Sequence, residues 1–160
     1  MIPMKHHSDM RGGFPVAGFD TLSGAERVLV RALRHWSDGP EGQDHIARLL
    51  LEVMGEARAK TCQRALNDVM GLIGRHGRRK LIRHQPHCSC VGADEAVFAH
   101  FIMLAATGER EDAMLVGSLI VEGPLLLPLT EAARQAGLYL HRSTLSGMVP
   151  ATDMAGVTVH

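Results

Sequence analysis

Residues 93–107, Ala-Asp-Glu-Ala-Val-Phe-Ala-His-Phe-Ile-Met-Leu-Ala-Ala-Thr, are the stretch that decides the fold of this chain. Apart from Asp94 and Glu95 at its start, the segment is apolar on almost every face of a helix, with His100 as the exception. A helix of this kind is typically buried on all sides. The two carboxylates fall in the first turn, where the helix dipole favours negative charge. The segment therefore predicts a central helix that the rest of the chain surrounds.

A second strongly apolar segment, residues 111–121, follows closely. Its first turn carries Glu111 and Asp112, again at the end of a helix where carboxylates are favourable. The polar linker of residues 108–111 is short enough to join two antiparallel helices. We therefore expect these two apolar helices to be the central, largely buried helices of the fold.

Three segments in the first half of the chain show the pattern of amphipathic helices. Apolar residues recur at spacings of three and four, which places them on one helix face. Ser23 and Glu26 have the spacing of a capping box at the start of the first helix, and Pro40 suits the first turn of the second. The basic side chains expected on the opposite face of the first helix are Arg27, Arg31 and Arg34. The predicted helices cover residues 23–36, 40–54 and 56–73.

One more helix is predicted in the C-terminal part of the chain. Pro128 suits the first turn of a helix and Gly137 suits its end, so the helix is expected between them. Residues 138–140 would then form a short extended segment packed on the bundle. Residues 1–20 and 143–160 lack hydrophobic periodicity, which predicts a disordered N-terminal arm and a flexible C-terminal tail.

The composition fits a single domain. The chain has 160 residues, of which 46% are hydrophobic, and this is enough to bury a core without help from a metal ion. We expect residues 21–142 to form one all-α domain, a compact bundle of about six helices with two central, largely buried helices between flexible termini.

Charge and targeting signals point to no membrane or polyanion as an obligatory partner. The 17 Lys and Arg residues balance the 17 Asp and Glu residues, so any electrostatic attraction must come from local patches. The N-terminus lacks the apolar core of a secretory signal, and the apolar stretch around residues 96–106 is too short to span a bilayer. We therefore expect a cytoplasmic protein, in which three cysteines do not form a disulfide framework.

The only pattern that indicates a specific chemistry is the loop sequence His-Gln-Pro-His-Cys-Ser-Cys at residues 84–90. Thiolates and imidazoles are the ligands that zinc prefers, and Cys88 and Cys90 would project to the same side of an extended segment. A third thiolate could come from Cys62, about 18 Å before the end of its helix, because residues 75–88 can span up to about 46 Å. The predicted zinc ligands are Cys62, Cys88, Cys90 and either His87 or His84.

The same residues have three other interpretations. An iron–sulfur cluster is less suitable than zinc, because clusters usually take four cysteines and this chain has three. Alternatively, Cys62 is an ordinary core cysteine and the loop cysteines bind no metal. In a further interpretation, the neighbouring cations lower the pKa of nearby thiols and make Cys88 or Cys90 a reactive thiolate, which is typical of a metal-free redox sensor.

The cations before the loop form a basic run with no acidic residue between Gly74 and Ala93. Such a run can bind nucleic acid or an acidic protein. The run lacks aromatic residues for base stacking, however. A solvated loop is therefore an alternative, in which the cations increase solubility and interact favourably with the C-terminal end of the third helix. The cations of this run are Arg75, Arg78, Arg79, Lys80 and Arg83.

No enzyme motif is present: the chain has no Gly-rich phosphate loop, no H-E-x-x-H and no G-x-S-x-G. The interpretation that follows is a non-enzymatic regulatory or adaptor protein with a zinc site beside a basic loop, acting through a protein or nucleic-acid partner. The alternatives are a metal-free thiol redox sensor and a nucleic-acid-binding regulator that uses the basic loop.

Overall fold

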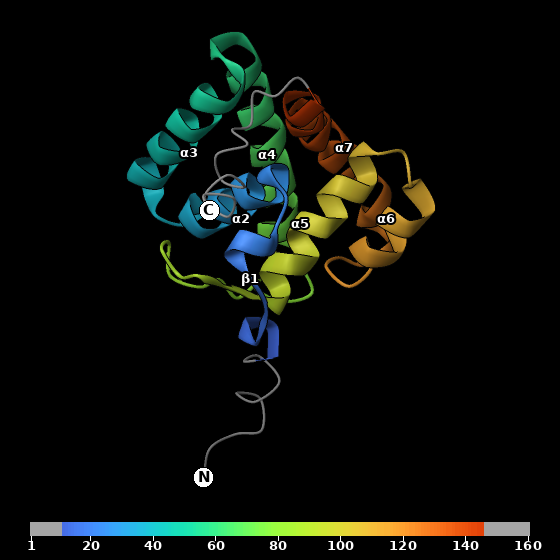
Figure 1. Ribbon diagram of the computed structural model, residues 1–160. Helices are drawn as coiled ribbons and strands as arrows, with labels where there is room; N and C mark the ends of the chain where they lie inside the picture. Colours follow the sequence, from blue (N-terminus) through green and yellow to red (C-terminus); the bar gives the residue numbers. More distant parts are fainter. Residues whose placement is uncertain (1–10, 146–160) are drawn as a thin grey trace.

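Six α-helices make up most of the part of the chain that is described by the computed structural model, residues 11–145 (Figure 1). Their arrangement confirms the predicted all-α bundle. The first four begin and end within three residues of the predicted positions, because apolar periodicity and capping are local signals. The helices are α2 (Gly24–Trp36), α3 (Gly39–Met54), α4 (Glu56–His76), α5 (Ala93–Ala106), α6 (Arg110–Gly117) and α7 (Gly123–Leu145).

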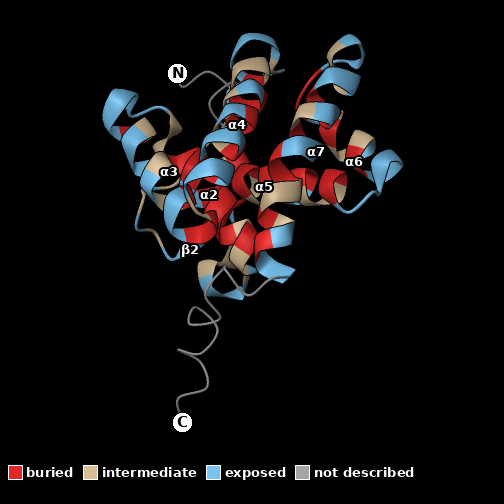
Figure 2. Cartoon of the chain, turned by 90° about the horizontal axis from the view of Figure 1, so that it is seen from above, coloured by how far each residue is buried: buried red, intermediate tan, exposed pale blue. Residues whose placement is uncertain are grey.

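Helix α5 occupies the centre of the bundle, as its sequence predicts. Phe98, Phe101 and Ile102 are fully buried. Segment 111–121 was predicted to be the second central helix, but this position is taken by α7, which packs against both α4 and α5. Only residues 110–117 of that segment form a helix, α6, and its Leu115 side chain is 69% exposed. Figure 2 shows that buried residues gather where the helices face one another.

Helix α7 continues through both residues that were predicted to bound it. Pro128 lies in the second turn of the helix. Because proline has no N–H, one carbonyl group near the start of the helix has no intrahelical hydrogen-bond donor, and the rest of the helix is unaffected. Gly137 lies inside the helix because it faces α5: a Cβ atom there would lie 2.7 Å from the Cβ atom of Ala106 and from the carbonyl oxygen of Ile102. The prediction of a helix end and an extended segment at this point is therefore wrong.

The N-terminal segment from Arg11 is part of the fold, although it was expected to belong to a disordered arm. Two short 3-10 helices (Arg11–Gly13 and Phe19–Thr21) flank β1 (Pro15–Gly18), which pairs antiparallel with β2 (Cys90–Gly92). The register pairs Gly18 with Cys90, with an irregularity between Pro15 and Ala17. This small sheet joins the N-terminal segment to the end of the cysteine loop.

The remaining predicted arm and tail, residues 1–10 and 146–160, lie outside the described residues. Residues 143–145, which were predicted to begin the tail, are the last turn of α7. Within residues 11–145, no helix has both the length and the apolar character that a membrane crossing requires.

Candidate functional site

Two acidic residues at the start of α5 hold the segment that joins α4 to β2. The Asp94 carboxylate accepts two hydrogen bonds from the Arg79 guanidinium, at 2.6 and 2.7 Å, and a third from the backbone N–H of Ile82 at 2.7 Å. Its neighbour Glu95 accepts hydrogen bonds from the backbone N–H groups of Gly92 at 3.0 Å and His84 at 3.3 Å. These contacts fix a segment that has almost no regular secondary structure.

Glu95 also forms a buried ion pair with Arg34 of α2. The Nε and Nη2 atoms of Arg34 lie 2.6 and 3.0 Å from the two carboxylate oxygens, a bidentate geometry. The Arg34 side chain is 1% exposed and that of Glu95 is 0% exposed. Because both charges are removed from water, each depends on the other for compensation.

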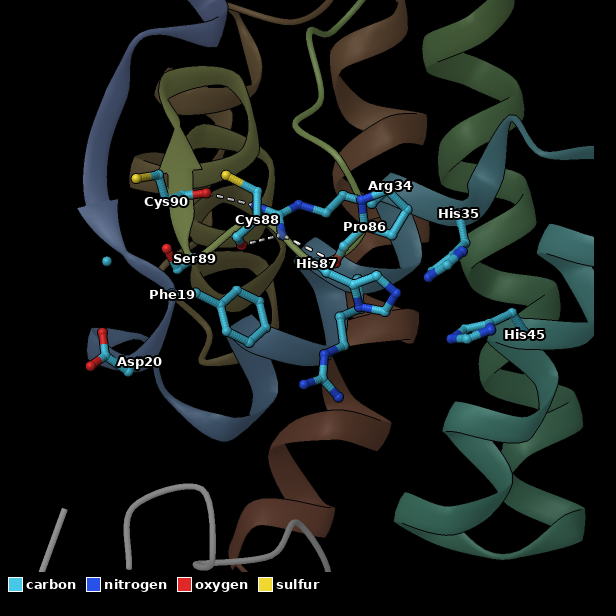
Figure 3. A pocket seen from close by; sticks show the side chains of 12 residues that line it. Phe19, Asp20, Arg34, His35, His45, Pro86, His87, Cys88, Ser89 and Cys90 are labelled. Atoms are coloured by element: carbon cyan, nitrogen blue, oxygen red, sulfur yellow. Dashed lines mark hydrogen bonds between the residues drawn. The ribbon is translucent and has the colours of Figure 1, made fainter. Parts of the chain in front are cut away.

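The same guanidinium holds the cysteine loop by its backbone (Figure 3). Arg34 donates hydrogen bonds to the carbonyl oxygens of Cys88 and Cys90, both at 2.8 Å, and a longer one of 3.4 Å to that of Pro86. The loop therefore closes over a buried cation. The backbone positions of both cysteines are set by α2, which is far away in the sequence.

Arg34 was expected on the solvent-facing side of its helix, and this expectation is wrong. Arg27 and Arg34 are buried, whereas Arg31 is exposed. The reason is that α2 is covered on a second face by α5 and the loop. The sequence did contain a signal for this second face in Val30, an apolar residue outside the main stripe and one turn before Arg34.

His84 lies between three groups that accept hydrogen bonds. Its Nε2 atom is 2.6 Å from the carbonyl oxygen of Gly13, and its Nδ1 atom is 3.1 Å from that of Cys90 and 3.5 Å from the Sγ atom of Cys88. Carbonyl oxygens can only accept, so both bonds form only when both ring nitrogens carry a proton. The pKa of His84 is accordingly raised, chiefly by the Gly13 carbonyl, with contributions from Cys88 and Glu95.

The Cys88 thiol is the natural counterpart of this imidazolium ion. Its pKa is lowered by a hydrogen bond with the backbone of Cys90 and then by the hydrogen bond with His84. Cys88 is partly exposed and Cys90 is exposed, so reagents can reach both. The four groups Arg34, Glu95, His84 and Cys88 form a series of alternating charges when Cys88 is a thiolate.

His87, the other predicted histidine ligand, belongs to a different group of side chains. It lines a cavity together with His35 of α2 and His45 of α3 (Figure 3). The rings of His35 and His45 are stacked, with centroids 3.8 Å apart. Burial lowers the pKa of His35, and the neighbouring His45 lowers it further.

Cys62, the predicted third thiolate ligand, lies in the core. It is 0% exposed, and its Sγ atom lies 3.7 Å from the carbonyl oxygen of Ala136 in α7. Burial raises the pKa of its thiol to about 12. Among residues 11–145, no three His, Cys, Asp or Glu side chains are grouped in a way that could hold a metal ion. The zinc site stays a prediction, which the metal content of purified protein would test, and His84 and Cys88 are the predicted ligands with contacting side chains.

Three cations of the basic run bind the protein's own chain. Arg79 pairs with Asp94, and Arg78 donates to the carbonyl oxygen of Ser118 at 2.9 Å. Arg83 donates to the carbonyl oxygen of Arg34 at 2.8 Å, near the C-terminal end of α2. The run therefore does more than provide charge for solubility: it fastens the loop to α2, α5 and the segment after α6.

The sequence could place Cys88 beside His84, because the two residues are four apart in one loop. It could not indicate Arg34 and Glu95, which are 61 residues apart and whose contact arises only from the packing of α2 on α5. Neither a protein-family model nor a curated protein nor a solved structure matches this chain.

Proposed function

We propose that this protein is a thiol-based redox sensor whose reactive group is the Cys88 thiolate, paired with the His84 imidazolium ion. One observation carries the proposal: both nitrogens of the His84 ring face carbonyl oxygens, while Nδ1 lies 3.5 Å from the Cys88 Sγ atom. A cation held in this way favours the thiolate, and the thiolate is the nucleophilic form of cysteine. The proposal assumes a reducing compartment such as the cytoplasm, in which the resting thiols stay reduced.

The proposed chemistry is thiol–disulfide exchange with a small disulfide. The Cys88 thiolate attacks one sulfur atom, a mixed disulfide forms, and the other half of the small disulfide leaves as a thiolate. Cys90, two residues further along the chain, then attacks the Cys88 sulfur as a thiolate and releases the second half. The net result is a Cys88–Cys90 disulfide and two molecules of small thiol, a two-electron oxidation of the protein.

Oxidation at this position is expected to alter the loop and its contacts. The carbonyl groups of both cysteines are held by Arg34, and Cys90 is the first residue of β2. A Cys88–Cys90 bond restricts the backbone between these anchored points, so the Arg34 contacts and the β1–β2 pairing must adjust. This change of surface is the signal that we propose a macromolecular partner reads.

The reactivity of Cys88 tests this proposal. We expect iodoacetamide to alkylate Cys88 at a lower pH than an ordinary thiol, because its pKa is lowered by the backbone of Cys90 and by His84. The thiolate is lost as pH falls through the lowered pKa of Cys88, and the imidazolium ion is lost as pH rises through the raised pKa of His84. Both shifts therefore favour the ion pair over the neutral pair, and mass spectrometry of tryptic peptides gives the alkylation rate at each pH.

His84→Gln provides the decisive comparison. It should move the alkylation profile of Cys88 to higher pH and slow the reaction severalfold at neutral pH. The matched control is His45→Gln, which removes a histidine that lines the neighbouring cavity but is not among the groups that shift the pKa of Cys88. Cys62 should stay unlabelled in the folded protein because it is buried. An unchanged profile in His84→Gln, or a wild-type profile like that of free cysteine, contradicts the proposal.

A further inference from the structure

We infer that the cavity beside the cysteine loop binds the carboxylate-bearing part of a small disulfide, so that anionic disulfides are the preferred oxidants of Cys88. This inference rests on the proposed reactivity of Cys88. The cavity has a volume of about 800 Å³, which is within the usual size range of small-molecule sites. Four parts of the chain form it: the segment after β1, α2, α3 and the loop (Figure 3).

The walls of the cavity carry an excess of groups that bind anions. Arg31 provides a permanent positive charge, and three histidines provide ring N–H donors. Among the described residues that line the cavity, Asp20 has the only carboxylate. The Arg34 charge is already compensated by Glu95, so Arg31 is the cation available to a ligand. The histidines are His35, His45 and His87.

Arg31 is positioned by an aromatic ring. Its guanidinium carbon lies 5.2 Å from the centroid of Phe19, a distance typical of cation–π contacts. Phe19 is itself fixed by the loop, because its backbone N–H donates to the carbonyl oxygen of Ser89 at 2.7 Å. The cation and the loop that carries the thiols therefore belong to one connected arrangement.

Cys88 and Cys90 line the same cavity as Arg31 and His87. A disulfide that reacts with Cys88 thus has its other atoms in or beside the cavity that Arg31 lines. A carboxylate on such a molecule can pair with the Arg31 guanidinium, a favourable geometry for this anion. Disulfides of carboxylate-bearing thiols combine the sulfur that Cys88 attacks with the anion that the cavity accepts.

The test measures how fast three disulfides of similar size react with the Cys90→Ser protein, in which the mixed disulfide at Cys88 accumulates. They are 3,3′-dithiodipropionate, which is anionic, 2-hydroxyethyl disulfide, which is neutral, and cystamine, which is cationic. Rates are measured by mass spectrometry at neutral pH and divided by the rates of the same reagents with free N-acetylcysteine. We expect the anionic disulfide to be favoured over the neutral one by on the order of tenfold, because its carboxylate can pair with the Arg31 guanidinium.

Arg31→Gln should remove most of this preference, measured as the ratio of the normalised rates of the anionic and neutral disulfides. Arg64→Gln is the matched control, because Arg64 is an exposed arginine of α4 that does not line the cavity. If the normalised rates of all three disulfides are equal, the cavity inference is wrong and the proposed function stands. The same conclusion follows if Arg31→Gln and Arg64→Gln lose the preference for the anionic disulfide equally. If the normalised rate is no higher than one for every reagent, Cys88 reacts no faster than free N-acetylcysteine, and the proposed function itself is wrong.

Discussion

Replacing Glu95 with Gln should lower the free energy of unfolding by about 3–5 kcal/mol, the usual effect of removing one partner from a buried ion pair. The amide keeps the size of the side chain but leaves the Arg34 charge without compensation in a site where the arginine is 1% exposed. Two backbone N–H groups, those of His84 and Gly92, lose a charged acceptor at the same time. The shift of the urea midpoint at an unchanged slope measures the effect.

A matched control separates burial from the mere loss of a charge. Glu131→Gln breaks another Arg–Glu contact, in which Arg134 lies 2.7 Å from the carboxylate, but both side chains are about half exposed. The arginine there is solvated after the change, so the midpoint should hardly move. If the two Gln variants unfold at the same urea concentration, the importance that we assign to the buried pair is wrong.

Removing both charges should restore much of the lost stability. In Arg34→Met/Glu95→Leu no unpaired ion remains, and apolar side chains of similar volume can fill the site. The double variant still lacks the guanidinium that holds the carbonyl groups of Cys88 and Cys90. We therefore expect it to be stable while its loop is loosened, which should appear as faster hydrogen exchange at the backbone amides of residues 84–90.

The four N-terminal helices could be predicted from the sequence because their signals are local. Ser23 accepts a hydrogen bond from the backbone N–H of Glu26 at 3.2 Å, as the capping-box spacing indicates. The strand β1 could not be predicted in this way: it has four residues, begins with Pro15 and has no alternation of apolar and polar residues. Its position is set by its partner β2, which is more than 70 residues away.

In the candidate site, too, the local contacts could be predicted from the sequence and the long-range contacts could not. His84 and Cys88 lie in one loop, so their contact was within reach of a local argument. For Cys62, chain length gave only an upper limit on how far the loop could extend, and it could not give a direction. Asp94 and Glu95 suit the helix dipole at the start of α5, which the sequence indicates. Their main partners, however, are Arg79 and Arg34, which only the tertiary structure brings there.

Gly137→Ala should lower the free energy of unfolding by about 1–3 kcal/mol, because it adds an atom where two helices already touch. The new methyl group would lie 2.7 Å from both the Cβ atom of Ala106 and the carbonyl oxygen of Ile102. Neither neighbour can rotate away, since one is a short side chain and the other is backbone. Helices α5 and α7 must separate, and this cost exceeds the roughly 1 kcal/mol by which Ala is normally favoured over Gly inside a helix.

Gly74→Ala is the matched control for this prediction. Gly74 is an exposed residue in the last turn of α4, and a Cβ atom there would have no neighbour within 4 Å. The same chemical change should therefore stabilise the protein by up to about 0.5–1 kcal/mol, through reduced entropy of the unfolded chain. Urea unfolding of the two variants should give shifts of opposite sign. If both variants are stabilised, α5 and α7 are not in close contact at Gly137. The continuation of α7 beyond this glycine, where the sequence predicts a helix end, would then have another cause.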